Sequence, residues 1–466
     1  MTIRIANGAG FLGDNLDASR LLVESAEVDY LTLEYLAELT LSVLTHLRKR
    51  DETAGYAHDF IDVLHSLCPS LSRQPKLHIV TNAGGINAAS CARAAAKVLV
   101  DADIGDESIG VVLGDDLLDR LDALQAAGCS FENLDTNEPL RGLKKLVVSA
   151  NAYLGAAPVT AALAGGARIV LTGRVADASL TVGPAMHEFG WEEDDWNRLA
   201  AASVAGHLIE CGAQVTGGYL AHWRGVDLTN VGYPIAELSE DGRAVITKPS
   251  GTGGAVNRET VVEQLIYEIG DPRHYLTPDV DVDFTTVEVY ESGPDRVTVH
   301  GATGRPAPDS YKVSLAYHDG YMASGQLLVY GSDCIEKARV AADLIVQRVR
   351  RAGFSLDQTN VELLGAGCGV PGLLRHPTCD AAESSPYAQV GEVVLRISVC
   401  DSRREAVERF TKELAPLITS GPAGLAGYAI GRSRVRPVYA YWPTLIRKNL
   451  IEPVVEVRSA KEWSRR

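Results

Sequence analysis

Three side chains able to transfer protons occur close together in the densest polar stretch of the chain, which runs from His207 to Tyr219. On a helix, His207 lies three residues from Glu210 and four from Cys211, so the three share one face. A histidine beside a carboxylate and a thiol can move protons or activate a nucleophile. Packing in the core or at an interface is the alternative interpretation. Because no third ligand is present, the pattern predicts no metal site.

A second candidate follows an apolar run, where Arg174 and Asp177 lie three residues apart in the segment Thr172–Ser179. A guanidinium at such a turn can hold a carboxylate or phosphate through two hydrogen bonds. Asp177 can act as a base, orient Arg174 or cap the next helix. The structural alternative is a salt-bridged helix cap.

Glycine-rich turns recur along the first 255 residues, several of them directly after a short apolar run. They lie at Ile5–Asp14, Val80–Asn87, Val148–Gly155, Leu171–Ser179 and Pro249–Gly254. In a parallel α/β sheet such turns emerge at the carboxyl edge of the strands, where these sheets bind ligands. We therefore expect the five turns to converge on one site and to present free amides to an anion.

This convergence predicts a set of residues that bind a small anionic substrate. Arg174, Lys248 and the amides around Gly84, Gly85 and Gly253 are expected to hold a carboxylate or stabilise an enolate-like oxyanion. The other predicted substrate-binding residues are Asn7, Asp14, Asn82, Asn87, Asn151, Tyr153 and Thr252. Protons are expected to move through Asp177, Glu210 or His207.

The first turn also allows a different function. Gly8, Gly10 and Gly13 fit the Gly-x-Gly-x-x-Gly pattern, and Glu34 follows about 20 residues later, where a dinucleotide site needs an acid for a ribose hydroxyl. An NAD(P)-dependent oxidoreductase is therefore one alternative. The nearby carboxylate of Asp14 disfavours it, because it would repel a pyrophosphate.

The elements that must position these residues change in character along the chain. Apolar strands alternate with helices up to residue 172, which predicts an α/β fold with a doubly wound, mostly parallel sheet. One of these helices is expected over 56–67, stopped by Pro69. From about residue 280 the chain becomes β-rich, with separate strands expected at 311–317 and 321–330 and helices at 333–351 and 403–418. We therefore predict an α/β domain over 1–279 and a second, α+β lobe over 280–466.

Bulk composition excludes several classes of function. The 466 residues carry 60 acidic and 44 basic side chains, a formal charge of −16, which disfavours binding to nucleic acid or to an anionic membrane. The eight cysteines contain no Cys-x-x-Cys pair, and the chain has neither an apolar leader nor a membrane-spanning apolar run. These features predict reduced thiols and a cytoplasmic location.

Long motifs in the same turns resemble the acyclic terpene utilisation family AtuA, a DUF1446-type family. They are Ser149–Ala156, Thr172–Leu180, Gly183-Pro184 with His187–Trp191, His207–Tyr219, Ile246–Lys248 with Gly251–Gly254, Glu263–Pro272, Ser420–Pro422 and Trp442-Pro443. The resemblance covers nearly the whole chain. It implies a role in bacterial breakdown of acyclic terpenes or related acids, a route that runs through branched acyl-CoA esters.

The resemblance therefore implies an enzyme acting on an acyl-CoA or branched carboxylic acid by hydration, dehydration, hydrolytic or lyase chemistry. A CoA thioester is the expected substrate moiety, and no cofactor is predicted. Some family members carry a small ferredoxin-fold domain at the carboxyl end. Only 23 residues follow Trp442-Pro443, so we expect such a subunit to be encoded separately. A binding or scaffold subunit completed by this partner is the non-enzyme alternative. The Tyr- and apolar-rich strands over 311–330 predict a homo-oligomer.

Overall fold

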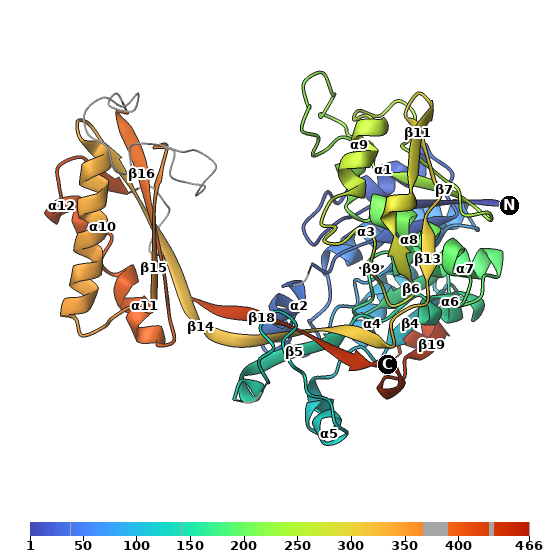
Figure 1. Ribbon diagram of the computed structural model, residues 1–466, viewed down its shortest axis with the longest axis horizontal. Helices are drawn as coiled ribbons and strands as arrows, with labels where there is room; N and C mark the ends of the chain where they lie inside the picture. Colours follow the sequence, from blue (N-terminus) through green and yellow to red (C-terminus); the bar gives the residue numbers. More distant parts are fainter. Residues whose placement is uncertain (38, 141, 367–389, 428–432, 466) are drawn as a thin grey trace. The chain divides into compact units, whose positions relative to one another are not determined.

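The computed structural model describes residues 1–37, 39–140, 142–366, 390–427 and 433–465, and the chain divides into two compact units (Figure 1). The first unit is Met1–Ala316 with Tyr441–Arg466, and the second is Tyr317–Ala440. The boundary expected near residue 280 falls inside the first unit. That residues 1–279 and 280–466 form an α/β domain and an α+β lobe stays a prediction.

A large mixed sheet forms the centre of the first unit. Its parallel part contains, side by side, β1 (Thr2–Asn7), β2 (Tyr30–Leu33), β3 (His78–Thr81), β6 (Ile169–Thr172) and β4 (Ser108–Leu113). Beyond β1 the sheet continues through β7 (Ile235–Ser239), β8 (Ala244–Thr247), β12 (Arg296–His300) and β11 (Glu288–Gly293), each antiparallel to its neighbour. The other edge, beside β4, is closed by the antiparallel β19 (Val454–Ser459).

The prediction of an α/β fold is confirmed, whereas that of a doubly wound, mostly parallel sheet is not, since both edges are antiparallel. The strands over 284–300, predicted to belong to a second lobe, instead extend this first sheet, because β12 pairs with β8. The chain after Trp442-Pro443 also completes the first unit. It supplies β19 and the short α13 (Ala460–Trp463), whose Trp463 indole donates to the Ile109 carbonyl at 3.1 Å.

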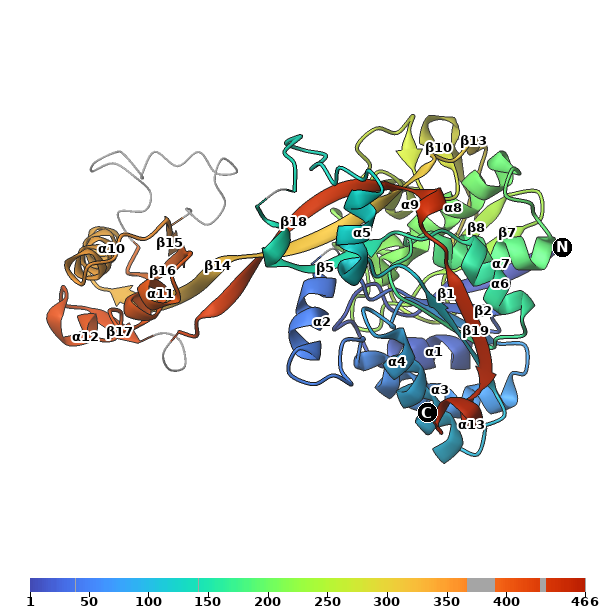
Figure 2. The ribbon, with the colours of Figure 1, turned by 90° about the horizontal axis from the view of Figure 1, so that it is seen from below.

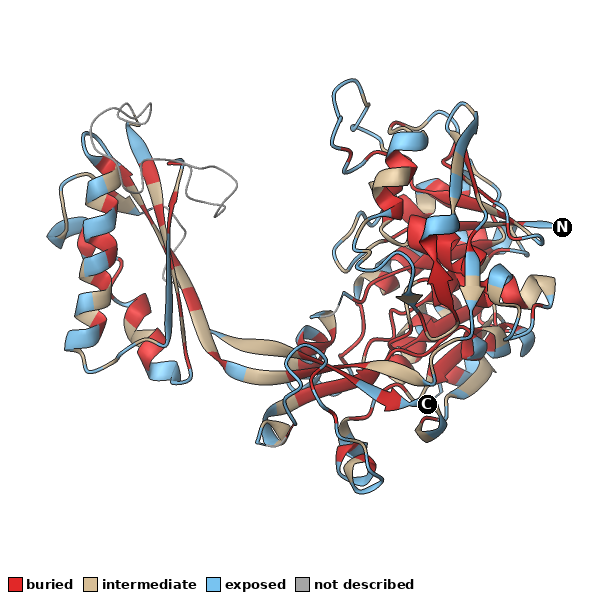
Figure 3. Cartoon of the chain, in the orientation of Figure 1, coloured by how far each residue is buried: buried red, intermediate tan, exposed pale blue. Residues whose placement is uncertain are grey.

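Helices lie on both sides of the sheet. Figure 2 shows α1 (Ala18–Ser25), α3 (Asp59–Arg73) and α4 (Ala88–Asp101) on one side, and α6 (Ala157–Ala164), α7 (Ser179–Phe189) and α8 (Trp196–Glu210) on the other. The remaining helices of the first unit are α2 (Thr40–Arg48), α5 (Leu121–Ala126) and α9 (Arg258–Leu265), with short 3-10 turns η1 (Leu118–Arg120), η2 (Lys144–Leu146), η3 (Gly212–Thr216), η4 (Phe284–Thr286) and η6 (Lys448–Leu450). Buried side chains concentrate in the sheet and on the helix faces that cover it (Figure 3).

The predicted end of a helix at Pro69 is wrong, because α3 continues through that residue to Arg73. Proline removes one backbone hydrogen bond inside a helix, a cost of roughly 3 kcal/mol or more. The next turn buries Ser70 and Leu71 almost completely. Burial of this apolar face therefore holds the last turn of α3 in place despite the proline.

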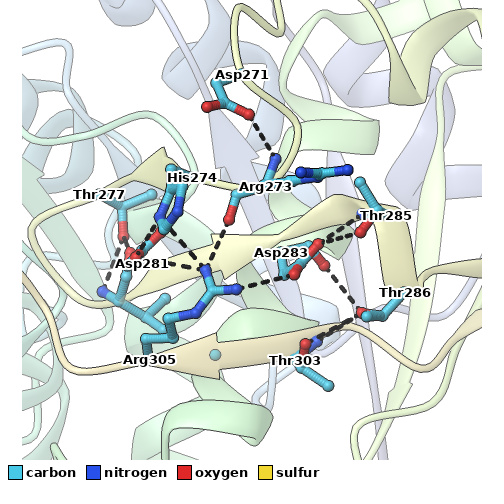
Figure 4. A network of polar contacts seen from close by, with 12 residues as sticks. Asp271, Arg273, His274, Thr277, Asp281, Asp283, Thr285, Thr286, Thr303 and Arg305 are labelled. Carbon is cyan, nitrogen blue, oxygen red and sulfur yellow. Dashed lines mark hydrogen bonds and ion pairs between the residues drawn. The ribbon is translucent and has the colours of Figure 1, made fainter.

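A small antiparallel sheet of the first unit contains β9 (Tyr275–Leu276), β10 (Asp281–Asp283) and β13 (Thr303–Arg305). Figure 4 shows the polar network that ties its strands together. The Arg305 guanidinium donates to Asp283 at 3.0 Å and to the Arg273 carbonyl at 2.7 Å, while His274 Nδ1 lies 3.0 Å from Asp281. These contacts fix the strand that carries Tyr275.

The second unit has its own antiparallel sheet and core. Strands β15 (Gln358–Leu364), β16 (Glu392–Asp401), β14 (Ser310–Tyr330) and β17 (Leu425–Gly427) lie side by side, with α10 (Cys334–Arg351), α11 (Arg404–Thr411) and α12 (Leu417–Ser420). The two strands expected at 311–317 and 321–330 are one continuous strand, β14. It begins in the first unit and ends in the second. Two further strands, β5 (Val147–Ala152) and β18 (Arg436–Arg447), also pair with β14.

No helix in the described ranges is both long and apolar enough to cross a membrane.

Candidate active site

The last turn of α8 presents His207 and Glu210 side by side. Nδ1 of His207 lies 3.1 Å from Oε1 of Glu210, and Nε2 lies 3.0 Å from the carbonyl oxygen of Gln264. A carbonyl oxygen only accepts, so Nε2 must carry a hydrogen. Nδ1 therefore faces the Glu210 carboxyl across a hydrogen-bonding distance. The helical spacing predicted from the sequence produces this pair.

The imidazole of His207 is held on every side. It is 2% exposed, and the rings of Tyr275 and Phe284 pack on it with centroids 5.9 and 5.6 Å away. On α9, the Gln264 amide donates to the His207 carbonyl at 3.2 Å. Tyr275 lies in β9, between the His274 and Thr277 labelled in Figure 4. These contacts fix the ring in one orientation. The second carboxyl oxygen of Glu210 has no hydrogen-bond partner among the described residues.

Arg174 and Asp177 form the second half of the site, in the turn after β6. The buried guanidinium of Arg174 lies 2.8 Å from Asp177 Oδ1 and 3.8 Å from Glu34 Oε1, and it donates to the Leu36 carbonyl. Its Cζ also lies 4.0 Å above the ring centroid of Tyr153. Arg174 therefore forms ion pairs with carboxylates of the chain itself, as the salt-bridged alternative predicted, whereas Asp177 does not cap α7, whose N-cap residue is Ala178.

Burial governs the protonation of these acids. It raises the pKa of the Asp177 carboxyl well above its usual range, the Arg174 charge opposes this, and the neighbouring Glu34 and Glu210 carboxylates add to it. Burial likewise raises the pKa of Glu34, against the opposing Arg174 charge. The Asp177 side chain is 36% accessible because it lines a cavity. A neutral, cavity-lining carboxylic acid can donate a proton.

The active-site cavity has a volume of about 680 Å³ and lies entirely within the first unit. Its lining contains the four predicted catalytic residues and Tyr153, together with Lys312, Glu268, Tyr275, Leu276 and Asp309. Two cations, Arg174 and Lys312, thus face four carboxyl groups. Such a surface disfavours a free anion, and it suits a neutral carbonyl that needs acid and base groups on either side.

Two predicted substrate-binding residues, Asn82 and Asn7, contact the site without lining its cavity. Asn82 donates to Glu34 at 2.5 Å and accepts from the Tyr35 amide at 2.8 Å. Asn7, at the end of β1, donates to the carbonyls of Ile209 and Glu210 at 2.6 and 2.8 Å, which ties the sheet to the end of α8. These side chains are fully buried and hold the catalytic groups without lining the cavity.

The Pro249–Gly254 turn does not reach the cavity. Lys248 forms an ion pair with Asp295 at 3.1 Å and donates to the Thr252 carbonyl at 2.8 Å. The Gly253 amide donates to Asn230 at 2.7 Å. None of these three predicted residues lines the cavity. Of the five turns, only Val148–Gly155 and Leu171–Ser179 supply lining residues, so the expected convergence of all five turns is not seen.

The amides expected to hold an anion are also used by the chain itself. Gly8 donates to the Thr32 carbonyl at 3.0 Å, Gly10 to Asp14 at 2.8 Å, and Gly85 to the Asn82 carbonyl at 3.1 Å. A Cβ placed on Gly10 would lie 2.7 Å from the Cys211 backbone, so the end of α8 fills the space beside this turn. Similarly, the Gly13 amide donates to Asp59 at 2.8 Å.

The dinucleotide interpretation gains no support from these contacts. The Gly8–Gly13 turn packs on the protein's own backbone, and Glu34 is buried against Arg174 and Asn82. A ribose hydroxyl would have to displace one of these partners. Two other predicted residues, Asn87 and Asn151, line a separate cavity.

Sequence reasoning missed four residues at or behind the site: Lys312, Tyr275, Gln264 and Asp115. Lys312 offered one signal, because it is a lone cation in an apolar strand segment. Tyr275 comes from a distant part of the chain and no local pattern marks it, whereas Gln264 lies in the motif Glu263–Pro272, to which no site role was assigned. Asp115 is fully enclosed and accepts from the Arg174 amide at 2.8 Å and the Asn151 amide at 2.9 Å.

Neither a reactive thiol nor a metal centre emerges from the geometry. Burial, aided by the Glu210 charge, raises the pKa of Cys211 to about 12, so its thiol stays protonated at neutral pH. Among the described residues, no group of three or more His, Cys, Asp or Glu side chains could hold a metal ion.

Comparison with known proteins gives one match. The model of the acyclic terpene utilisation family protein AtuA matches residues 3–457. No curated protein and no solved structure matches the chain.

Proposed function

The chain belongs to the acyclic terpene utilisation family AtuA, and from this membership we propose that it is a proton-transferring enzyme acting on a branched acyl thioester in the breakdown of acyclic terpenes or related acids. The single observation that carries the proposal is the contact of 3.1 Å between His207 Nδ1 and Glu210 Oε1. These groups line a cavity that also presents a carboxylic acid of raised pKa, Asp177. Paired groups with different proton affinities are what acid–base catalysis requires.

The reaction that best fits this pair is reversible hydration of an α,β-unsaturated thioester. The second carboxyl oxygen of Glu210, held in place by His207, accepts a proton from water as the water oxygen bonds to the β-carbon. The C=C electron pair shifts toward the carbonyl and forms an enolate. Asp177 then delivers its proton to the α-carbon, so atoms and charge balance. Arg174 acts through Asp177 as a positioning residue, and Lys312 stabilises negative charge on the carbonyl oxygen.

A thioester suits the cavity better than a free acid, because its reacting carbonyl is neutral. Four carboxyl groups against two cations would repel a carboxylate, even with Asp177 protonated. We also propose that the protein acts in the cytoplasm and assembles with a second copy or with a small partner subunit. Assays are therefore run with and without the partner.

Proton transfer can be tested directly, before the natural substrate is known. A panel of branched enoyl- and acyl-CoA esters is incubated with the protein in D₂O, and mass spectrometry measures deuterium at the α-carbon. Glu210→Gln and His207→Asn should each slow exchange by about a hundredfold or more. Arg174→Ala should cost more than about tenfold, by misplacing Asp177.

Glu263→Gln is the matched control, because this glutamate precedes Gln264 on α9 and lies outside the cavity. It should leave exchange unchanged. Exchange that is equally fast in wild type, Glu210→Gln and His207→Asn would remove the pair from the mechanism. Melting temperatures verify that each variant folds.

A further inference from the structure

The first unit contains a second cavity, of about 540 Å³, beside the turn between β3 and α4. Three cations line it: Arg48 and Lys49 at the end of α2, and Arg93 in α4. None of the three forms an ion pair within the described part of the chain, although most other arginines there do. The Arg48 guanidinium donates to the Ile86 carbonyl at 2.8 Å, and Arg93 donates to the Ser90 hydroxyl at 2.6 Å. Both guanidinium groups are thereby oriented while other N–H groups stay available.

The amino end of α4 adds a backbone contribution. Asn87 caps this 14-residue helix by accepting from the Ser90 amide, and it lines the second cavity. The first helical residues, Ala88 and Ala89, line a smaller adjoining space of about 290 Å³ that shares Arg48 and Asn87 with the second cavity. First-turn amides have no partner within a helix, and the helix dipole favours negative charge there. Cations and helix end together favour phosphate groups.

The same cavity also presents hydrogen-bond acceptors. Three carboxyl groups, those of Glu52, Asp116 and Asp119, line it beside the three cations. Asn151 lines it too, and its buried Oδ1 has no hydrogen-bond partner among the described residues. The orientation of this amide is fixed, because its Nδ2 donates to the Asp115 carboxylate at 2.9 Å. Carboxylates repel bare phosphate but accept from hydroxyl and amino groups. A lining of cations plus acceptors therefore matches a nucleotide, which carries phosphates, ribose hydroxyls and base N–H groups.

We propose that the second cavity binds a nucleoside diphosphate group. This inference rests on the proposed function, because the nucleotide end of a CoA thioester is one source of that group and a free nucleotide is the other. The two cavities are neighbours: Asn151 lines the second and Tyr153, two residues on, lines the active-site cavity. Asp115 lies between them and accepts from both Asn151 and the Arg174 backbone.

Titration calorimetry on the full chain tests the site with three probes: coenzyme A, ADP and pyrophosphate. We expect ADP and coenzyme A to bind at least about tenfold more tightly than pyrophosphate. Tighter binding of coenzyme A than of ADP identifies a thioester carrier, and equal binding identifies a free nucleotide. Both outcomes support the nucleotide site. Pyrophosphate binding as tight as ADP, or no binding of ADP and coenzyme A at millimolar concentration, overturns it.

Variants locate the binding. Lys49→Ala and Arg93→Ala should each weaken ADP binding by about tenfold. Arg50→Ala is the control, since Arg50 is an exposed cation beside Lys49 that does not line the cavity. An equal effect of all three variants, or no effect of Lys49→Ala and Arg93→Ala, rejects the site. Failure here leaves Glu210-dependent deuterium exchange intact, so it is distinguishable from failure of the proposed function.

Discussion

Arg174 is the residue on which the charge balance of the site depends. Its guanidinium contacts Asp177 and Glu34. The negative charge of Glu210 raises the pKa of both carboxyl groups. One cation cannot keep three nearby carboxyl groups ionised, and the raised pKa of Asp177 and of Glu34 favours the neutral form of these two. The spacing of Arg174 and Asp177 predicted their contact, but the sequence did not reveal Glu34 as the third member, because it arrives from another strand. Because Arg174 contacts carboxyl groups of the chain itself, this arrangement supports the proposed acid–base role more than the anion clamp expected at this turn.

The position of Cys211 beside Glu210 suggests a reactive thiol, but its burial argues against one. It lies next to Glu210 and was a candidate nucleophile, yet burial raises its pKa to about 12. We predict that Cys211→Ala keeps deuterium exchange close to the wild-type rate. Mass spectrometry of iodoacetamide-treated native protein at neutral pH should find Cys211 far less alkylated than after unfolding. Rapid alkylation in the native state, or loss of exchange in Cys211→Ala, would contradict this.

At the scale of elements, the alternation of apolar runs and helices predicted the central strands, because buried parallel strands read as short apolar runs. The antiparallel edges were not predictable in this way. The residues of a strand do not show which other strand it pairs with. Tertiary packing decides which sheet is joined by β7, β8, β11 and β12. The four-residue β3 and β6 are parallel neighbours, so Asn82 and Arg174, which follow them, lie at the same end of the sheet.

Asp115, two residues after β4, gives this edge a pH-dependent stability. Burial raises its pKa to about 6 from the usual 3.8, while hydrogen bonds from the Arg174 backbone and Asn151 oppose the shift. The folded state then holds its proton more tightly than the unfolded state does. Its stabilising contribution is complete below pH 4 and is lost as pH rises to about 6, by about 3 kcal/mol.

Asp115→Asn should remove this pH-dependent contribution to the free energy of unfolding while preserving an acceptor for the Arg174 backbone amide. Urea unfolding between pH 4 and 7 should show Asp115→Asn gaining stability relative to wild type as pH rises. Asp119→Asn, an exposed neighbour on the same segment, serves as the control and should show no such trend. A constant difference between Asp115→Asn and wild type across this range contradicts the prediction.

At the scale of the whole molecule, one contiguous segment, Tyr317–Ala440, forms a compact unit inserted between two parts of the first. Composition changes near residue 280, although the antiparallel strands of the first unit already begin with β7 at Ile235. β14 crosses from one unit into the other, and the polar residues His318-Asp319-Gly320 interrupt its apolar pattern just after Ala316, where the sequence predicted two separate strands. Every residue lining the two cavities belongs to the first unit.

The insertion predicts that catalysis and assembly are separable. Because β18 pairs with β14, the chain ends left by deleting 317–440 lie on neighbouring strands, and a short Gly/Ser linker can join them. We expect this deletion variant to unfold cooperatively and to retain both Glu210-dependent exchange and ADP binding. The second unit has a hydrophobic core of its own, so residues 317–440 should also fold alone.

Light scattering should find the full chain oligomeric and the deletion variant smaller, since the second unit exposes Tyr330 and Val361 on its strands. A folded deletion variant without exchange would show that the second unit supplies part of the chemistry, and an unchanged oligomer would place assembly in the first unit.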